Sequence, residues 1–583
     1  GGGASGNGGQ AGGGQAGGGQ AGGGQAGGGQ AGGGQAGAAA GRGGAAGAGP
    51  PAVNVLTHHN DVQRTGANLQ ETVLNTSNVN VNQFGKLFEW PVDGDVYAQP
   101  LYVSNVTLAG AGARNVVYVA SMHNTVFAYD ADSSSTMPLW ATDLTVLGSP
   151  IPVSATTGLD VQPGPQDIAT EIGTLSTPVI DLASHTLYLV SSSLDAAGVH
   201  HQRLHALDLS TGGEKLGGPV ELGASVPGDG PGSSNGQLTF DPVIENQRSA
   251  LLLTGGTLYI AWASHNDAHD YHGWVMAYDA ATLKQTAAWA STPNGRAAGI
   301  WQTGAGPAAD GAGNVYVETG NGDFDAARHN YGDSVVKLSS TLAVTDSFTP
   351  RNQKYLSDID LDLGSSGPVV IPGTSFVVAS GKEGKLYLLD RAHLGGYNPA
   401  GDTVVDEFQA TPLPACDPTC NGGQWQLYFH IHAAPVFWNG PQGPFLYVWA
   451  ERDYLKSFRL LPNGLQHTPS AQSPSPAPPG MPGGFLSISA NGSQAGTGIV
   501  WALHPVSVDG SNTDAAASGA RVRGILQAFD AMDVSKELYD SRMNAARDDL
   551  GNFAKFNVAT VANGRVYVPT MSKKIAVYGL LSR

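Results

Sequence analysis

The stretch from Ala98 to Asp143 decides the fold, and it reads AQPLYVSNVTLAGAGARNVVYVASMHNTVFAYDADSSSTMPLWATD. It contains three short runs rich in Val, Tyr and Phe and a fourth run, PLWATD, with one aromatic residue, separated by Gly, Asn and Ser, a pattern typical of β-strands joined by turns. No amphipathic helical period of useful length interrupts these runs. The stretch therefore predicts one four-stranded sheet.

The same order of strands recurs eight times along the chain. The repeats align on one residue of the third strand in each, namely Ala128, Ala206, Ala277, Val336, Leu388, Ser457, Ala528 and Ala576. Their spacing of 48 to 78 residues is typical of four-stranded propeller blades with loops of variable length. We therefore expect an all-β fold, an eight-bladed β-propeller.

The two ends of the repeat region complement each other. The eighth repeat reaches the carboxyl terminus with three strands, whereas the strand KLFEWPV at Lys86–Val92 precedes the first repeat and has no blade of its own. We expect this strand to be the outer strand of the last blade, because such closure removes an open sheet edge. The predicted organisation is an arm at residues 1–49, a linker and lead-in at 50–85, and the propeller at 86–583.

Several repeat segments resemble the tryptophan-docking repeats of pyrroloquinoline-quinone-type (PQQ-like) β-propellers. They are AYDADSSSTMPLW, ALDLSTGGEKLGG, AYDAATLKQTAAW and AFDAMDVSKELY. The segments HNDVQRTGAN and GKEGKLYLLDR further resemble secreted bacterial members of this group. The resemblance implies that neighbouring blades dock through Ala128, Asp130, Trp140, Ala206, Asp208, Ala277, Asp279, Trp289, Ala528 and Asp530.

The resemblance also defines what a quinone site would need. Quinoprotein alcohol dehydrogenases of this shape use a disulfide between adjacent cysteines, a Ca²⁺ held by acidic and Asn side chains, and an Asp base. The two cysteines of this chain, Cys416 and Cys420, have three residues between them, and we expect them to close a small loop as a disulfide. We therefore expect that the protein requires no cofactor and that PQQ is not bound.

Two runs of alternating acidic residues are candidate Ca²⁺ sites. One comprises Asp358, Asp360 and Asp362 in DIDLDLG, and the other comprises Asn321, Asp323 and Asp325 in GNGDFDA. Like carboxylates on one side of an extended chain repel each other unless a cation or hydrogen bonds intervene. Both alternatives remain open for each run.

Histidines form two further polar groups. His430 and His432 lie two apart in an expected strand and so share a face, either as two metal ligands without an evident third or as hydrogen-bonded side chains lining the propeller. The loop SHNDAHDYHGW could coordinate an ion or form a turn network through His265, Asp267, His269, Asp270 and His272.

The amino-terminal arm repeats AGGGQ five times from Ala11 to Gln35. So much glycine supplies no side chain to bury, which favours either a flexible linker or an extended arm that packs against other chains through its backbone. In the second case the Gln amides would add contacts, at Gln10, Gln15, Gln20, Gln25, Gln30 and Gln35.

Composition narrows the functional classes. The net charge is −18, from 29 basic and 47 acidic residues, which argues against binding of nucleic acid or anionic membranes. No apolar run is long enough for a transmembrane helix. The start at Gly1 and the scarcity of Cys suggest the mature form of a secreted, extracellular or surface protein.

These observations favour a non-catalytic role. We expect an extracellular structural protein whose propellers self-assemble with copies of themselves, as a filament or surface layer, through the glycine-rich arm. The alternatives are a secreted or periplasmic quinone-dependent dehydrogenase and a propeller that binds a ligand or a protein.

Overall fold

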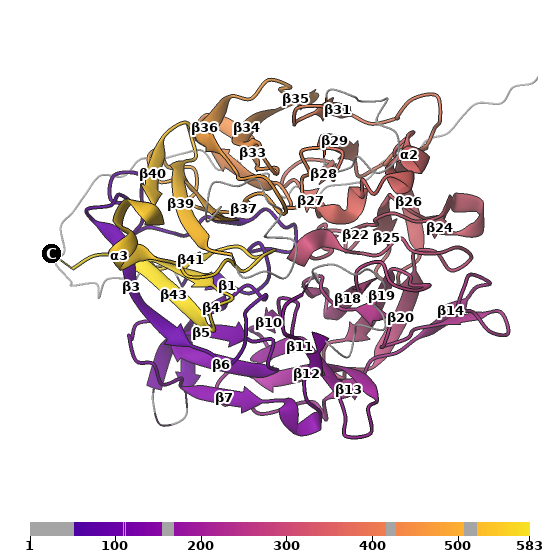
Figure 1. The fold of residues 1–583 in the computed structure, drawn as a ribbon, viewed down its shortest axis with the longest axis horizontal. Coiled ribbons are helices and arrows are strands. Elements are labelled where there is room, and N and C mark those ends of the chain that lie inside the picture. The colour runs from indigo at the N-terminus through magenta and orange to yellow at the C-terminus, as the bar shows by residue number, and fades with distance from the viewer. Residues whose placement is uncertain are drawn as a thin grey trace, which may run out of the picture. The chain divides into compact units, whose positions relative to one another are not determined.

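Eight antiparallel sheets form the blades of a β-propeller, as the repeats predicted (Figure 1). The computed structural model describes residues 52–108, 110, 112–153, 168–414, 427–506 and 522–582. The glycine-rich arm, with its Gln residues, and Cys416 and Cys420 lie outside the described residues. No helix among the described residues has the length and apolar character needed to cross a membrane.

Each blade contains four strands that run from the axis outward. Blades 1 and 2 comprise β4 (Leu101–Leu108), β5 (Gly112–Ala120), β6 (Thr125–Asp130) and β7 (Trp140–Asp143), then β10 (Val179–Asp181), β11 (Thr186–Leu194), β12 (His200–Asp208) and β13 (Val220–Glu221). Blades 3 and 4 comprise β17 (Leu252–Thr254), β18 (Thr257–Ser264), β19 (Trp274–Asp279) and β20 (Gln285–Ala290), then β21 (Ala308–Ala309), β22 (Val315–Glu318), β25 (Val335–Leu338) and β26 (Val344–Thr349).

The second half of the ring repeats this order. Blades 5 and 6 comprise β27 (Val369–Val370), β28 (Phe376–Ser380), β29 (Lys385–Asp390) and β31 (Asp406–Gln409), then β32 (Val436–Gly440), β33 (Gly443–Val448), β34 (Tyr454–Leu461) and β36 (Ala471–Pro476). Blades 7 and 8 comprise β37 (Phe485–Ser489), β38 (Ile499–Pro505), β39 (Gly524–Asp530) and β40 (Glu537–Asp540), then β41 (Thr560–Ala562), β42 (Arg565–Pro569), β43 (Lys574–Leu580) and β3 (Phe84–Pro91).

Short elements occupy the connections between blades and the loop between β22 and β25 of blade 4. Two helices are present among the described residues, α2 (Gln353–Asp358) and α3 (Ala545–Asp548). Three small hairpins pair β8 (Ile151–Pro152) with β9 (Glu171–Ile172), β14 (Ser225–Pro227) with β15 (Gln237–Thr239), and β23 (Phe324–Asp325) with β24 (Asn330–Tyr331).

The hydrophobic core lies between neighbouring blades. Residues Thr186 to Ser193 of β11 are all buried, because a middle strand is covered on both faces by adjacent blades. The outer strand β7 instead alternates half-buried and exposed residues. This difference explains why the second strands have almost continuous apolar sequences while the outer strands are short and mixed.

The first strand of the sheet region closes the ring. β3 pairs with β43 in an antiparallel register from Phe84 opposite Leu580 to Pro91 opposite Lys574, so both ends of the chain share blade 8. Figure 1 shows the indigo β3 beside the yellow β43. Trp90 of β3 is fully buried and stacks on Tyr129 of blade 1, with ring centroids 4.8 Å apart. The closing strand therefore also joins blade 8 to blade 1.

Residues 53–71, which we call the axial strap, bond to every blade in turn. β1 (Asn54–Val55) pairs with β4, and β2 (Ala67–Asn68) pairs with β37. Backbone carbonyls of the strap accept hydrogen bonds from the inner strands of blades 2, 4, 5, 6 and 7, at Ile180, Ala309, Val370, Phe437 and Ile488. Side chains complete the circuit, from Arg64 to the Leu251 carbonyl beside blade 3 and from Asn68 to the Val561 carbonyl in blade 8.

Tyrosines of the second strands latch one blade to the next. Their hydroxyls donate to carbonyls at or just after the turn that follows the third strand of the next blade: Tyr118 to Leu209, Tyr188 to Ala280, Tyr259 to Ser340 and Tyr447 to Ala531. These bonds measure 2.7 to 2.9 Å. The sequence did not predict these hydrogen bonds, because tyrosines are common in β-strands whether or not their hydroxyls bond to a neighbouring blade.

The predicted docking residues lie at the same blade junctions. Ala128, Ala206, Ala277 and Ala528 are fully buried. The indole N–H of Trp140 donates to the Leu209 carbonyl of blade 2, and Trp289 contacts Tyr331 of blade 4. The aspartates accept hydrogen bonds within the turn after the third strand, as Asp130 does from the Asp132 amide and Asp530 from the Met532 amide. Asp208 and Asp279 make equivalent turn contacts.

Replacing Tyr188 by Phe should lower the free energy of unfolding by about 1–3 kcal/mol, because the Ala280 carbonyl would lose its buried donor. Denaturant unfolding measures the change. Tyr397→Phe is the matched control, since this tyrosine is 45% exposed. Equal unfolding midpoints for both variants would show that the latch contributes nothing.

Candidate functional site

Buried polar side chains gather at the ends of the inner strands. They lie in the segments that lead into these strands, at Gln99, Thr177, Arg248, Gln302, Asp362, His432 and Asn557. Hydrogen bonds join them across blades: the Gln99 amide N–H donates to Thr177 Oγ1 at 2.9 Å, and Gln99 Nε2 donates to Thr560 Oγ1 at 3.0 Å. Because equivalent ends of the inner strands meet around the axis, these side chains share one face of the propeller.

Residues from both predicted acidic runs meet around one lysine. Asn321 follows β22, Asp360 and Asp362 precede β27, and Lys382 follows β28. Lys382 Nζ lies 2.7 Å from Asp360 Oδ1 and 2.5 Å from Asp362 Oδ2. Asn321 donates from Nδ2 to Asp360 at 2.8 Å and from its backbone amide to Asp362 at 2.7 Å. An ammonium group thus lies between the two carboxylates.

The other members of the two runs point elsewhere. Asp358 forms an exposed ion pair with Lys354. Asp325 caps the short 3₁₀ helix Ala326–Arg328, and Asp323 accepts a hydrogen bond from the Arg296 amide. The expectation of two three-residue sites is therefore replaced by one cluster that takes Asn321 from one run and Asp360 and Asp362 from the other. We call these three residues with Lys382 the Asp-Lys cluster.

The cluster separates the ionisation of its two carboxyl groups. Burial raises the pKa of Asp360 to about 7 despite the opposing charge of Lys382. Burial also acts on Asp362, but Lys382 and the Asn321 amide outweigh it and hold the pKa of Asp362 below its usual value. The two carboxylates raise the pKa of Lys382 despite its burial, so its ammonium stays charged. One carboxyl group is therefore poised to exchange a proton while the other stays ionised.

An aromatic pair borders the cluster. Tyr271 donates a 2.6 Å hydrogen bond to Asp267, and its ring meets Trp301 edge-on at 6.0 Å. Burial raises the pKa of Tyr271 well above its usual value, and the charges of Asp267, Asp362 and Asp360 raise it further. In the predicted histidine loop, His272 bonds to the Thr292 and Pro231 carbonyls, and Asp267 joins the turn network.

Glycine at position 320 brings Trp301 and Asp362 together. A β-carbon there would lie 2.3 Å from Asp362 Oδ1 and 2.8 Å from the Trp301 ring, so any other side chain would push them apart. Two buried polar atoms beside this point, Asn321 Oδ1 and Trp301 Nε1, have no hydrogen-bond partner among the described residues. Buried polar groups of native proteins are nearly always satisfied, so the pair points to a ligand.

Two buried basic side chains contact the rings of Trp301 and Phe556. The Arg248 guanidinium lies 5.4 Å from the Trp301 ring centroid and 4.9 Å from that of Phe556. Lys555 Nζ lies 5.2 Å from the Phe556 centroid, and Arg248 and Lys555 are 6% and 2% exposed. Phe556 has φ of 65°, a left-handed conformation that is costly away from glycine and is concentrated at functional sites.

The predicted histidine pair also lies on this face. The imidazoles of His430 and His432 are buried, with ring centroids 5.6 Å apart, and His432 lies 6.5 Å from Phe556. Glu451, which the sequence did not single out, contacts both. His432 and Glu451 are 19 residues apart, so no local pattern could have connected them.

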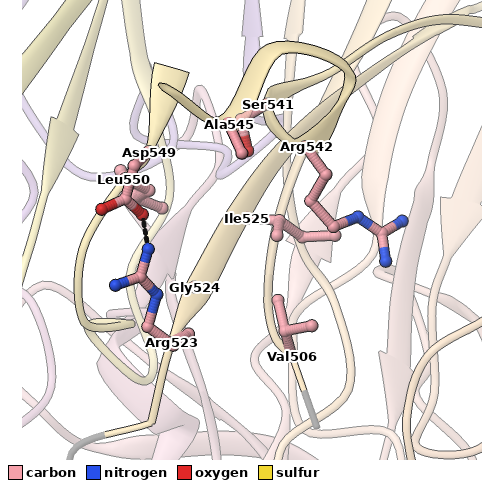
Figure 2. A pocket seen from close by; sticks show the side chains of 9 residues that line it. All are labelled: Val506, Arg523, Gly524, Ile525, Ser541, Arg542, Ala545, Asp549 and Leu550. Carbon is pink, nitrogen blue, oxygen red and sulfur yellow. Dashed lines mark hydrogen bonds and ion pairs between the residues drawn. The ribbon is translucent and has the colours of Figure 1, made fainter. Parts of the chain in front are cut away.

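A hollow of about 220 Å³ at the junction of blades 7 and 8 is less suited to bind a ligand. Figure 2 shows Arg523 paired with Asp549 on one side of it and Arg542 on the other. Arg542 is itself paired with Asp540. Its charged groups are therefore satisfied within the protein, unlike Asn321 Oδ1 and Trp301 Nε1.

Comparisons with known proteins identify the fold. No family model matches the sequence, and no curated protein matches it. Among solved structures, a quinohemoprotein alcohol dehydrogenase from Pseudomonas putida HK5 is similar with a TM-score of 0.53 and 13% identity, over 91% of this chain and 81% of that one. A europium-containing methanol dehydrogenase is similar with a TM-score of 0.52 and 12% identity, over 91% and 98%. The chain thus has the PQQ-like propeller fold.

Proposed function

We propose that the protein is a quinone-dependent oxidoreductase that acts on an alcohol, with its cofactor and a metal cation bound between the Asp-Lys cluster and the Arg248–Trp301 pair. The observation that carries the proposal is the pair of buried, unpartnered atoms, Asn321 Oδ1 and Trp301 Nε1. The structural neighbours carry the names of a quinohemoprotein alcohol dehydrogenase and a metal-containing methanol dehydrogenase, which agrees with this chemistry.

The cluster offers the ligands of a hard cation. Asn321 Oδ1 and the ionised carboxylate of Asp362 are the oxygen ligands that Ca²⁺ and similar ions prefer. When no cation is bound, Lys382 supplies the positive charge between Asp360 and Asp362. A cation bound beside it would replace part of that charge, and Lys382 would then be available to a negatively charged ligand.

The Trp301 side of the site fits a flat, anionic ring system. The indole offers a planar surface, and the basic side chains of Arg248 and Lys555 lie nearby, a combination that suits a flat ligand with carboxylates. A pyrroloquinoline quinone is planar and carries carboxylates. The sequence lacks the adjacent cysteines of the quinoprotein dehydrogenases, which is the ground for expecting no PQQ, and the proposal departs from that expectation because of the atoms and rings at Asn321, Trp301 and Arg248.

Asp360 is the candidate general base. Its carboxylate would accept the hydroxyl proton of an alcohol, and Lys382 Nζ, 2.7 Å away, stabilises the ionised form. When bound, the quinone supplies the two-electron acceptor that converts the alcohol to a carbonyl compound. Asn321, through its 2.8 Å bond, holds the Asp360 carboxylate in place.

We expect the purified chain to bind PQQ in the presence of Ca²⁺ and to oxidise primary alcohols with an artificial electron acceptor. Binding is measured by quenching of tryptophan fluorescence, and turnover by dye reduction. Asp360→Asn should reduce turnover about 100-fold with binding retained, because it removes the base and keeps the shape.

Asp358→Asn is the matched control, since Asp358 lies two residues away in an exposed ion pair. It should leave both readouts unchanged. If the wild-type chain bound no quinone with Ca²⁺ or a trivalent lanthanide ion, or if Asp360→Asn turned over as fast as Asp358→Asn, the proposed function would be wrong.

The assembly hypothesis concerns residues 1–49 and stays a prediction, as does the secreted location. No contact among the described residues bears on either, and an assembly arm is compatible with a catalytic propeller. The predicted disulfide between Cys416 and Cys420 is likewise untested.

A further inference from the structure

We propose that His430, His432 and Glu451 form a binding site for a divalent transition-metal ion of the Zn²⁺ class, separate from the Asp-Lys cluster. Among the described residues they are the one group of three or more His, Cys, Asp or Glu side chains whose ligand atoms all lie within 4.8 Å of one another. All three side chains are buried, at 1%, 1% and 5% exposure. The sequence pattern offered two ligands, and the fold supplies the third.

The separations fit coordination of one ion. Glu451 Oε1 lies 2.8 Å from His432 Nε2 and 3.8 Å from His430 Nδ1. Two ligand atoms bound to Zn²⁺ at about 2.0–2.1 Å in a tetrahedral site lie about 3.4 Å apart, between these two values. The two rings meet at an interplanar angle of 74°, so their nitrogens approach from different directions. Small side-chain rotations would therefore place all three atoms around one ion.

The fold fixes the backbone on both sides of the site. Thr303 Oγ1 donates to the His432 carbonyl, and Ser365 Oγ donates to the Ile431 carbonyl at 2.8 Å. The Glu451 amide donates to the His430 carbonyl at 3.0 Å, which joins the segment before β32 to the one after β33. These bonds fix the backbone of the two segments that carry the three ligands.

The ligand chemistry separates this site from the first one. Two imidazoles and one carboxylate favour borderline ions such as Zn²⁺, Co²⁺ or Fe²⁺, whereas the all-oxygen donors of the Asp-Lys cluster favour Ca²⁺ and similar hard ions. The alternative explanation for the contacts is an ion pair between protonated imidazole and Glu451. An ion pair needs one histidine only, while a metal site uses both.

The test uses the full-length chain treated with chelator and then titrated with Zn²⁺ and, separately, Co²⁺. We expect about one equivalent of Zn²⁺ by calorimetry and metal analysis, and visible Co²⁺ absorption bands that indicate a low-coordinate site with nitrogen and oxygen ligands. His430→Asn, His432→Asn and Glu451→Gln should each weaken Zn²⁺ binding about 100-fold.

Two controls keep the result interpretable. His467→Asn alters an exposed histidine that pairs with Asp406, and it should leave binding unchanged. Near-ultraviolet circular dichroism establishes that each variant is folded, and Glu451→Gln, which keeps the side-chain shape, serves if a histidine variant is not. A strong near-ultraviolet charge-transfer band with Co²⁺ would indicate thiolate ligands and overturn the assignment.

The proposal also fails if the wild type binds no stoichiometric Zn²⁺, or if the folded Glu451→Gln variant binds as tightly as wild type. If only the His432 variant lost affinity for Zn²⁺, His430 and Glu451 would not be ligands. The contact between Glu451 and His432 would then be an ion pair, and the three-ligand site would be wrong. None of these outcomes depends on quinone binding or on alcohol oxidation.

Discussion

Replacing Arg64 by Met should destabilise the propeller by about 3–5 kcal/mol, the loss typical of removing one partner from a buried charged network. The Arg64 side chain is completely buried in the axial strap. It donates to the Thr57 hydroxyl and to the carbonyls of His58, Leu251 and Pro307, over 2.7 to 3.0 Å. Methionine fills the space and leaves these four acceptors without their donor, at a cost that exceeds the gain from removing a buried charge.

Arg64→Lys is the informative companion. Burial lowers the pKa of Arg64 to about 10, so the group stays charged at neutral pH, and lysine would keep that charge. The single ammonium group of lysine cannot reach all the acceptors that the planar guanidinium contacts. We therefore expect a loss in the free energy of unfolding between those of wild type and Arg64→Met. Thermal and denaturant unfolding measure both variants. Wild-type midpoints for Arg64→Met would mean that the strap does not stabilise the ring.

Replacing Trp90 by Ala should cost about 3–5 kcal/mol and open the ring between blades 8 and 1. The indole is fully buried between Tyr129 and Tyr567, whose ring centroids lie 4.8 and 5.8 Å away. Alanine would leave a cavity at the closing strand, where both ends of the chain meet. Hydrogen exchange should show increased opening of β3 and β43.

Trp140→Ala provides the comparison for this prediction. Trp140 is half-buried, so less apolar surface is lost, and we expect a smaller effect of about 1–3 kcal/mol. If Trp140→Ala were the more damaging change, the docking tryptophans and not the closing strand would dominate the stability of the ring.

The propeller and its closure could be predicted because they leave a periodic signal. Eight repeats share strand order and turn residues. One strand, at Lys86–Val92, is left over and one sheet edge is left open, and in the structure this strand is β3, which pairs with β43 at that edge. The axial strap left no such signal. Its bonds to Ile180, Ala309 and Val370 are made by backbone carbonyls, which every residue has, so HNDVQRTGAN shows a family resemblance but no pattern that predicts these bonds.

The candidate site was predicted in part, for a similar reason. Asn321, Asp360 and Asp362 were selected because their spacing puts carboxylates on one side of an extended chain. The structure joins them across blades, and Asp323, Asp325 and Asp358 lie elsewhere. Lys382 follows β28 of the same blade and Trp301 lies in the segment before blade 4, and the packing of these loops places both side chains beside the acidic residues. Contacts between blades that are distant in sequence cannot be read from local spacing.

The axial strap has a consequence for synthesis of the protein. Residues 53–71 are made before any blade, yet their last partner is made near the end: Asn68 bonds to Val561, 493 residues later. Asn68 and β3, with its large apolar Trp90, must therefore wait for their blade 8 partners while seven blades are translated. Ordering such distant contacts is slow, and the waiting segment exposes a strand edge that can pair with other chains. A nascent chain of this kind gains from a chaperone, or from export before folding, until blade 8 is complete.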